Sequence, residues 1–206
     1  MDEHKKMERI GILGGTFDPV HRAHLMIAAV AREAAALDRV MLMPAGQPPH
    51  KEHRALTDAS HRLAMARLAA AGAGYEVSDL EIATPGVDYT VDTLRTLKGL
   101  YPDDRLYFII GGDSLMMLDQ WYRPDELMRL AAFVAVYRPG NSIVELERQR
   151  QALQARFGAE ILLVPSPGMD ISSTALRELA GRGADLSPWV PDAVADYIRE
   201  HRLYQA

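Results

Sequence analysis

The 206-residue sequence contains no cysteine. This excludes a thiol nucleophile, cysteine-ligated zinc and disulfide bonds, and it fits a reducing cytoplasm, where we expect the protein. Long apolar runs are missing too. The stretches at 25–31 and 130–137 are far too short to span a bilayer, and the first residues lack the apolar core of a signal peptide. We therefore expect no membrane association.

An excess of basic residues is also absent. The chain has 23 Lys and Arg against 28 Asp and Glu, a formal net charge of −5. Since a nucleic-acid-binding surface usually needs a basic stripe, we expect no nucleic-acid partner. The P-loop pattern G-x-x-x-x-G-K-[ST] does not occur, which argues against a P-loop ATPase or kinase, and GILGGTF at 11–17 does not fit the dinucleotide pattern G-x-G-x-x-G.

The pattern that is present alternates short apolar runs with longer helical ones in a chain of ordinary globular composition. It predicts strands at 9–13, 39–44, 75–82, 105–111, 131–137 and 160–165. It predicts helices at 22–36, 57–71, 143–157, 172–180 and 191–200, and a further helix that ends at Lys98 with Thr90 as its N-cap. We interpret the whole chain, 1–206, as one α/β domain: a Rossmann-like, doubly wound parallel sheet with helices on both faces and a C-terminal helical segment at about 171–206.

Three polar segments follow predicted strands: GGTFDPVHRAH at 14–24, PAGQPPHK at 44–51 and GGDS at 111–114. The carboxyl ends of parallel strands share one edge of a sheet, and ligands bind there. These segments are therefore candidates for one site. Taken singly, each is also typical of an ordinary turn or surface loop.

His21 and His24 are three residues apart, so they share one face near the positive start of a predicted helix. That placement favours an anion, with a divalent metal as the alternative because His50 and His53 repeat the spacing. A metal site held by protein ligands is not expected, since no carboxylate cluster accompanies the histidines.

ISSTALR at 171–177 places three hydroxyls and an arginine at a second predicted helix start. An ordinary N-cap explains one hydroxyl, whereas a phosphate cradle explains all of these groups together. PAGQPPHK is either a stiff surface loop or a carrier of cationic groups. In DQWYRP at 119–124 the tryptophan is either a core residue or a platform for a flat ring.

GGTFDPVHRAH and ISSTALR together resemble the paired motifs of the nucleotidyltransferase superfamily with H-x-G-H and I-S-S-T-x-x-R signatures. Within it, the sequence looks most like the bacterial nicotinate-nucleotide adenylyltransferases. The supporting segments are DYTVDTL, IIGGDSLMMLDQWY, YRPG and WVPDAVADYIREHRLY, which follow the order of that family over nearly the whole chain.

The resemblance implies adenylyl transfer from ATP to nicotinate mononucleotide, with Mg²⁺ arriving on ATP. It implies catalytic roles for His21, His24 and Arg177. It implies an ATP site made of Gly14, Gly15, Thr16, Phe17, His21, His24, Gly111, Asp113, Arg138, Ile171, Ser172, Ser173, Thr174 and Arg177. It implies a mononucleotide site made of His50, Lys51, Thr90, Trp121 and Tyr122.

Two positions depart from the family pattern: Ala23 replaces the glycine of H-x-G-H, and Asp88 precedes Tyr89-Thr90 where a serine is common. The alternatives are an adenylyltransferase for nicotinamide mononucleotide or phosphopantetheine, a non-catalytic nucleotide sensor, and a metal-binding regulator. The sequence contains no indication of the oligomeric state.

Overall fold

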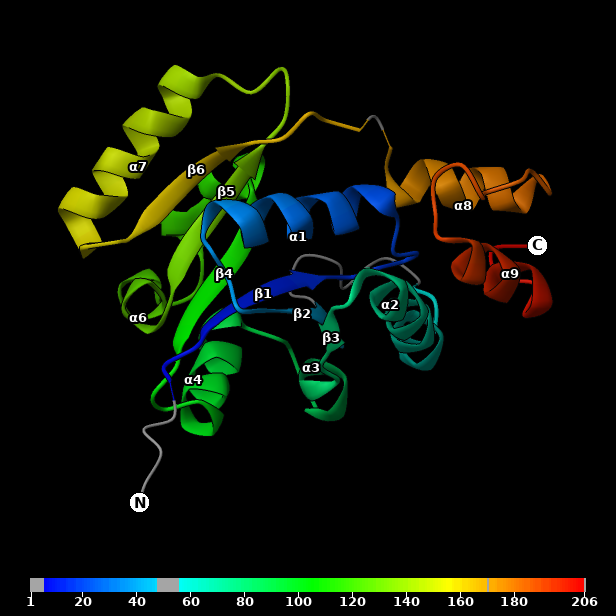
Figure 1. Ribbon diagram of the computed structural model, residues 1–206, viewed down its shortest axis with the longest axis horizontal. Helices are drawn as coiled ribbons and strands as arrows, with labels where there is room; N and C mark the ends of the chain where they lie inside the picture. The colour runs from blue at the N-terminus through cyan, green and yellow to red at the C-terminus, as the bar shows by residue number, and fades with distance from the viewer. Residues whose placement is uncertain (1–5, 48–55, 170, 206) are drawn as a thin grey trace.

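The structure, a computed structural model, describes residues 6–47, 56–169 and 171–205 (Figure 1). Its centre is a parallel six-stranded sheet in the order β3-β2-β1-β4-β5-β6. The strands are β1 (Arg9–Gly15), β2 (Arg39–Pro44), β3 (Glu76–Val77), β4 (Arg105–Gly111), β5 (Ala132–Tyr137) and β6 (Ile161–Pro165). This is the doubly wound arrangement expected from the alternating pattern.

The helices of the described residues connect and cover the strands. Their bounds are α1 (Arg22–Ala34), α2 (Ala59–Ala73), α3 (Leu80–Ala83), α4 (Thr90–Leu100), α5 (Gly112–Leu115), α6 (Pro124–Leu130), α7 (Ile143–Phe157), α8 (Ser173–Gly181) and α9 (Asp192–Glu200), with a 3₁₀ turn at Leu118–Gln120. None of them is long and apolar enough to cross a bilayer.

Two hydrophobic cores lie on opposite faces of the sheet because successive strand residues point to opposite sides. Ile10 and Ile12 face the core under α4, α6 and α7. Leu13 faces the other core, which α1, α2, α8 and α9 cover. The sheet is therefore buried on both faces, as its near-continuous apolar strands predict.

The chain reverses its direction of strand addition between β1 and β4, which pair from Arg9–Arg105 to Leu13–Ile109. At the carboxyl end of this strand pair α1 begins, and α8 begins beside it, although about 150 residues separate them in the sequence (residues 22 and 173) (Figure 1). A crevice at such a reversal point is where ligands bind in this type of sheet.

Three local predictions were wrong. The segment expected as a strand at 75–82 forms only the two-residue β3 and then α3, because it lies at the sheet edge and pairs only with β2. Thr90 is the first residue of α4 rather than its cap, which is Tyr89. Helix α6 was missed, because seven residues are too few for a clear 3.6-residue period.

A buried arginine joins the ends of β1 and β2. Arg62 on α2 is 1% exposed, and its guanidinium donates to backbone carbonyls on two loops, the one after β1 and the one between β2 and α2. The acceptors are the oxygens of Thr16 (2.9 Å), Ala45 (2.5 Å), Gly46 (3.2 Å) and Thr57 (2.9 Å). Burial lowers the pKa of Arg62, and the nearby Asp18 opposes that shift. The side chain thus satisfies four backbone carbonyls at once.

We expect Arg62→Met to lower the free energy of unfolding by about 3–5 kcal/mol, because it leaves several buried carbonyls unpaired. Urea unfolding monitored by circular dichroism measures the loss. Arg67→Met is the matched control on the same helix: Arg67 is exposed and bridges Asp79 at 3.4 Å, so we expect a change of about 0–1 kcal/mol. Equal losses in the two variants would contradict the anchoring role of Arg62.

Candidate active site

Three connected cavities lie at the carboxyl edge of β1 and β4. The first, of about 630 Å³, extends from Gly14, Gly15 and Thr16 to Thr90, Trp121 and Tyr122. The second, of about 430 Å³, lies between the starts of α1 and α8. The third, of about 250 Å³, lies between the loop after β1 and Arg177. Among the described residues, His24 alone lines all three.

The loop after β1 is fixed by close packing around Phe17. Phe17 is 1% exposed and has a left-handed backbone with a φ of 49°. A Cβ on Gly15 would lie 3.0 Å from the Phe17 ring, so a larger residue there would displace the ring. The same ring meets His24 edge to face, with a centroid distance of 5.0 Å. The glycine turn therefore allows an aromatic ring to support the histidine.

The two histidines form a stacked pair at the start of α1. Their ring centroids are 3.7 Å apart, and the backbone N–H of His21 donates to Nδ1 of His24 at 3.2 Å. His21 is 5% exposed, and burial lowers its pKa to about 4. His21 is therefore neutral at pH 7. Its Nδ1 is buried and makes no hydrogen bond with the residues that the structure describes, while the side chain as a whole lines the second cavity.

The three hydroxyl groups of ISSTALR make hydrogen bonds with three different partners. Ser172 is the N-cap of α8 and accepts from the backbone N–H of Ala175 at 3.2 Å. Ser173 donates to the carbonyl of Pro19 at 3.0 Å, and Thr174 accepts from Arg177 at 3.1 Å. The capping interpretation thus covers only the first hydroxyl, and Ser173 and Thr174 connect α8 to the loop after β1 and to Arg177.

Arg177 is held against the loop after β1 by a buried carboxylate. It donates to the backbone oxygen of Asp18 at 2.5 Å, and its Nη1 lies 4.0 Å from Oδ2 of that residue. Asp18 is 3% exposed and also accepts from the hydroxyl of Tyr204 at 2.8 Å. Arg177 lines both the second and the third cavity. Asp18 and Tyr204 were not singled out from the sequence, since nothing in their spacing predicts this contact.

The far wall of the second cavity carries a polar triad. Asp113 accepts from Arg138 at 3.1 Å and from the side chain of Asn141 at 3.0 Å. Asn141 in turn accepts from the backbone N–H of Arg138 at 3.0 Å. Gly111 and Ile171 also line this cavity, as their predicted roles require. Asn141 was missed because a single asparagine after Pro-Gly reads as a turn residue.

The remaining predicted residues lie at the other end of the first cavity. Trp121 is partly buried and meets Phe108 edge to face at 6.3 Å. Tyr122 is 48% exposed, and its ring centroid lies 4.5 Å from that of Tyr89. Thr90 begins α4, whose cap residue supplies no side-chain hydrogen bond within the described structure. The first amides of α4 are therefore suited to an anionic ligand group.

Two carboxyl groups that the sequence analysis did not place in a site line the same end of this cavity: Glu81 and Asp88. Burial raises the pKa of Glu81 to about 7, although its carboxylate accepts from Thr93 at 2.7 Å. Asp88 accepts from the backbone N–H of Gln47 at 2.6 Å, and burial also raises its pKa. Glu81 was missed because its segment was interpreted as a strand.

Asp88 and Gln47 hold the start of the loop after β2 through reciprocal hydrogen bonds, since the N–H of Asp88 also donates to the carbonyl of Gln47 at 3.1 Å. Beside them a Cβ on Gly46 would lie 2.5 Å from the carbonyl oxygen of Glu81, so only glycine fits. His50 and Lys51, predicted to bind a phosphate, lie outside the described residues, as does His53.

Metal ligands do not cluster in the part of the chain that the structure describes: no group of three or more His, Asp or Glu side chains there is arranged to hold an ion. The groups that converge on the second and third cavities are helix starts, hydroxyls, histidines and two arginines. These are donors suited to phosphate oxygens. The site is thus that of a protein that binds a phosphorylated nucleotide at the reversal point of a Rossmann-like sheet.

Comparison with known proteins agrees with this class. The model of the family described as "Cytidylyltransferase-like" matches residues 12–179. A protein of Symbiobacterium thermophilum described as a probable nicotinate-nucleotide adenylyltransferase is 43% identical over 199 residues, covering 96% of each chain. One with the same description from Oceanobacillus iheyensis is 41% identical, covering 96% of this chain and 97% of its own. The chain therefore belongs to the nicotinate-nucleotide adenylyltransferases of the cytidylyltransferase-like family.

Solved structures resemble the fold as well. The nicotinic acid mononucleotide adenylyltransferase of Plasmodium falciparum, complexed with NaAD, superposes with a TM-score of 0.75 at 22% identity, covering 96% of this chain and 97% of that one. The same enzyme complexed with APC has a TM-score of 0.74. At this identity the likeness establishes the fold alone, and it confirms the Rossmann-like prediction.

We expect Glu81→Gln to remove a pH dependence of stability. The pKa of Glu81 is about 7 in the folded chain against 4.5 as its ordinary value, so between these values the folded state holds the extra proton. Wild-type stability therefore falls as the pH rises from about 4.5 to 7 and stays low above that. At pH 8 the variant should be more stable by up to about 3 kcal/mol.

Urea unfolding at several pH values measures this difference. Glu33→Gln, at an exposed position on α1, should keep the wild-type slope. A wild-type slope that persists unchanged in Glu81→Gln would contradict the assignment.

Proposed function

We propose that this chain transfers the adenylyl group of ATP to nicotinate mononucleotide, giving nicotinate adenine dinucleotide and pyrophosphate. The observation that carries the proposal is the meeting at His24 of two cavities with different linings. One ends at an aromatic residue and a helix start suited to a pyridine ring with a carboxylate. The other is lined by phosphate-binding donors. The descriptions of the curated relatives support the same substrates.

The reaction needs no protein nucleophile. A phosphate oxygen of the mononucleotide attacks the α-phosphorus of ATP, and the bond to the bridging oxygen breaks, so that its electron pair leaves with pyrophosphate. A phosphate monoester with a second pKa of about 6 is already largely ionised at neutral pH. The chain therefore has to align two anions that repel each other and to stabilise charge on the leaving group.

In this proposal His24 stabilises the transition state and His21 binds the ATP phosphates as a neutral donor, because burial keeps its pKa near 4. Ser173, Thr174 and Arg177 bind the β- and γ-phosphates from α8. The turn at 14–17 lines the nucleotide cleft with its backbone amides. The replacement of the usual glycine by Ala23 is tolerated because this residue lies inside α1 and does not have a positive φ.

In this proposal the second cavity binds the adenosine part of ATP. Asp113 binds a ribose hydroxyl and Arg138 contacts the ATP moiety, with Gly111, Ile171 and Ser172 lining the wall. Because both oxygens of Asp113 already accept hydrogen bonds, its carboxylate is oriented before the nucleotide arrives. A ribose hydroxyl would share these oxygens rather than reorient them.

In this proposal the pyridine ring of the mononucleotide binds at the far end of the first cavity, away from His24. There Trp121 stacks on the pyridinium ring, an interaction between a cation and an aromatic face, while the backbone amides of Thr90 and Tyr122 meet the carboxylate. His50 and Lys51, outside the described residues, are proposed to bind the mononucleotide phosphate. These amides disfavour nicotinamide, which lacks the full charge.

Mg²⁺ is proposed to arrive on ATP, because the residues present fit a phosphate-bound ion rather than a protein-held one. The second cavity offers one carboxylate, Asp113, among mostly neutral or cationic donors. Mg²⁺ binds chiefly through phosphate oxygens and water in such sites. The ion would neutralise phosphate charge, and the chain would hold the phosphates through His21, His24 and Arg177.

We further propose that the chain acts as one domain in which the segment from about 171 supplies the second phosphate wall, and that it works in the cytoplasm. Nucleic acids and membranes have no part in the proposed reaction.

We expect His24→Ala to lower kcat by about 10²- to 10³-fold, as loss of one preorganised transition-state donor does, with smaller changes in both KM values. Pyrophosphate release with ATP and Mg²⁺ measures this, using nicotinate mononucleotide, nicotinamide mononucleotide and phosphopantetheine in parallel. His201→Ala, at an exposed position after α9, is the matched control and should keep full activity.

Turnover of nicotinate mononucleotide that is lost in His24→Ala supports both the reaction and the role. Preference for nicotinamide mononucleotide or phosphopantetheine would overturn the pyridine-pocket assignment. No turnover of any substrate, with ATP still bound, would favour the non-catalytic sensor.

A further inference from the structure

The two walls of the pyridine end of the first cavity come from separate parts of the chain. One wall is Thr90 at the start of α4, and the other is the Trp121–Tyr122 segment before α6. Neither wall belongs to the sheet. The width of this end therefore depends on what holds α4 and α6 relative to each other.

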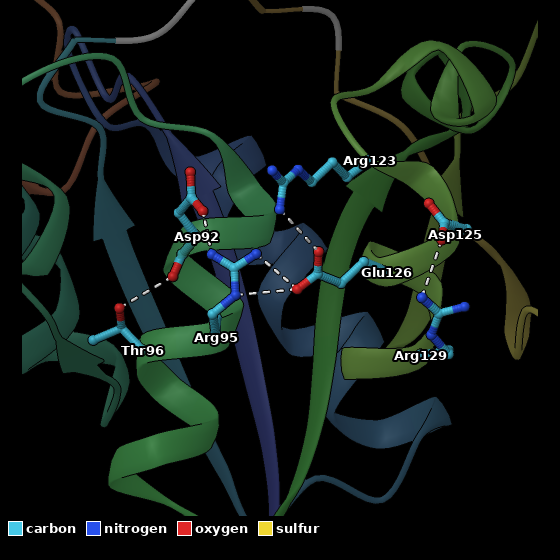
Figure 2. A network of polar contacts seen from close by, with 7 residues as sticks. All are labelled: Asp92, Arg95, Thr96, Arg123, Asp125, Glu126 and Arg129. Carbon is cyan, nitrogen blue, oxygen red and sulfur yellow. Dashed lines mark hydrogen bonds and ion pairs between the residues drawn. The ribbon is translucent and has the colours of Figure 1, made fainter.

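An ion pair joins the two helices directly. Arg95 on α4 directs Nε and Nη2 to the same oxygen, Oε1 of Glu126 on α6, at 3.1 and 2.7 Å (Figure 2). On its other side Arg95 donates to Asp92 at 2.5 Å, one turn back along α4. The guanidinium is thus held in one orientation from both helices, which favours a fixed geometry.

The second oxygen of Glu126 continues the network toward the tyrosine. It lies 3.5 Å from Nη1 of Arg123, and the Arg123 guanidinium lies 5.2 Å from the centroid of the Tyr122 ring. Arg123 has a left-handed backbone, with φ 52° and ψ 61°. A bulky residue adopts this conformation only where its surroundings enforce it. The backbone turn that presents Trp121 and Tyr122 therefore has Glu126 as one of its side-chain contacts.

We propose that Arg95, Glu126 and Arg123 are positioning residues, and that their network sets the distance between α4 and the Trp121–Tyr122 segment and thereby the affinity for the pyridine mononucleotide. This rests on the proposed function. None of the three residues lines a cavity of the site, so they act through Thr90, Trp121 and Tyr122. Partly exposed ion pairs contribute little to global stability, yet small displacements of a binding wall weaken binding strongly.

Glu126→Gln is the first test, because it removes the charge and keeps the shape. We expect KM for nicotinate mononucleotide to rise about tenfold, within the range of couplings between contacting residues. KM for ATP, kcat at saturation and the melting temperature should stay within about twofold, or about 2 °C, of wild type, since surface substitutions change stability little.

The matched control is Asp125→Asn, the same chemical change on the neighbouring residue of α6. Asp125 bridges Arg129 within the helix at 3.0 Å and points away from α4 (Figure 2). It should leave KM unchanged. The double variant Arg95→Gln with Glu126→Gln should raise KM little further than Glu126→Gln alone, since both substitutions break the same contact, whereas two unrelated structural effects would add.

A fluorescence measurement that needs no substrate tests this inference independently of the proposed reaction. In a Trp189→Phe background Trp121 is the sole tryptophan, and Glu126→Gln should increase its quenching by acrylamide while Asp125→Asn does not. If nicotinate mononucleotide is not turned over by the wild type but the quenching still changes, the proposed function fails and the positioning role stands.

Unchanged quenching and unchanged KM in Glu126→Gln would overturn the positioning role. So would changed quenching with an unchanged KM, or equal effects of Glu126→Gln and Asp125→Asn. A rise in KM for both substrates, or a large drop in melting temperature, would show a general loss of structure and would also overturn it.

Discussion

The bonds from the Arg62 guanidinium to the loop carbonyls determine where the site can form. Parallel strands end in backbone groups that no further strand pairs, and at the reversal point those ends must also stay open to ligand. Arg62 donates to the carbonyls of Thr16, Ala45 and Gly46 at these ends, while Thr16 and Ala45 also line the first cavity. Its charge is buried, and Asp18 is the main negative charge that compensates it. The turn after β1 that supports His24 and the start of the loop after β2 that Asp88 holds are both anchored by these hydrogen bonds of Arg62.

Asp18 extends the same arrangement to the C-terminal helices. It accepts from Tyr204 through its side chain and from Arg177 through its backbone oxygen. The start of α8 is thereby fixed against the loop that begins α1, and two helix starts meet over one cavity (Figure 1). Each start contributes the positive end of its helix dipole. Asp18 thus joins both C-terminal contacts to the loop before α1, and the proposed phosphate site is locally rich in donors although the chain as a whole is acidic.

The sequence was sufficient for the strands of the sheet centre because these are long apolar runs with clear stops. It was also sufficient to place the segments at 14–24 and 111–114 at one edge of the sheet, because both follow parallel strands that end there. It was insufficient where a short segment becomes a strand or helix only through its contacts with other elements. The edge strand β3 has one neighbour, and α6 has seven residues starting at a proline. Arg62 could have been found: it lies three, four, seven and eight residues before the buried Met65, Ala66, Ala69 and Ala70, the spacing of one helix face. For Glu81 and Asp88 no spacing signal exists, since their partners lie on other elements. For Glu126 the spacing shows only Arg123 at i−3 and not Arg95, which lies on another helix.

The distribution of charge along the site has a consequence for the pyridine end. Donors gather around the phosphates, whereas Glu81 and Asp88 place two carboxyl groups beside Thr90 in the first cavity. A pyridinium ring is cationic and is stabilised by nearby negative charge, but the nicotinate carboxylate is repelled by it. The raised pKa of Glu81, about 7, reduces this conflict because the group is partly protonated at neutral pH. Asp88 stays occupied by the Gln47 amide. In the proposed function the substrate carboxylate would then meet the first amides of α4 rather than two full charges, and Asp88 would lie beside the ring.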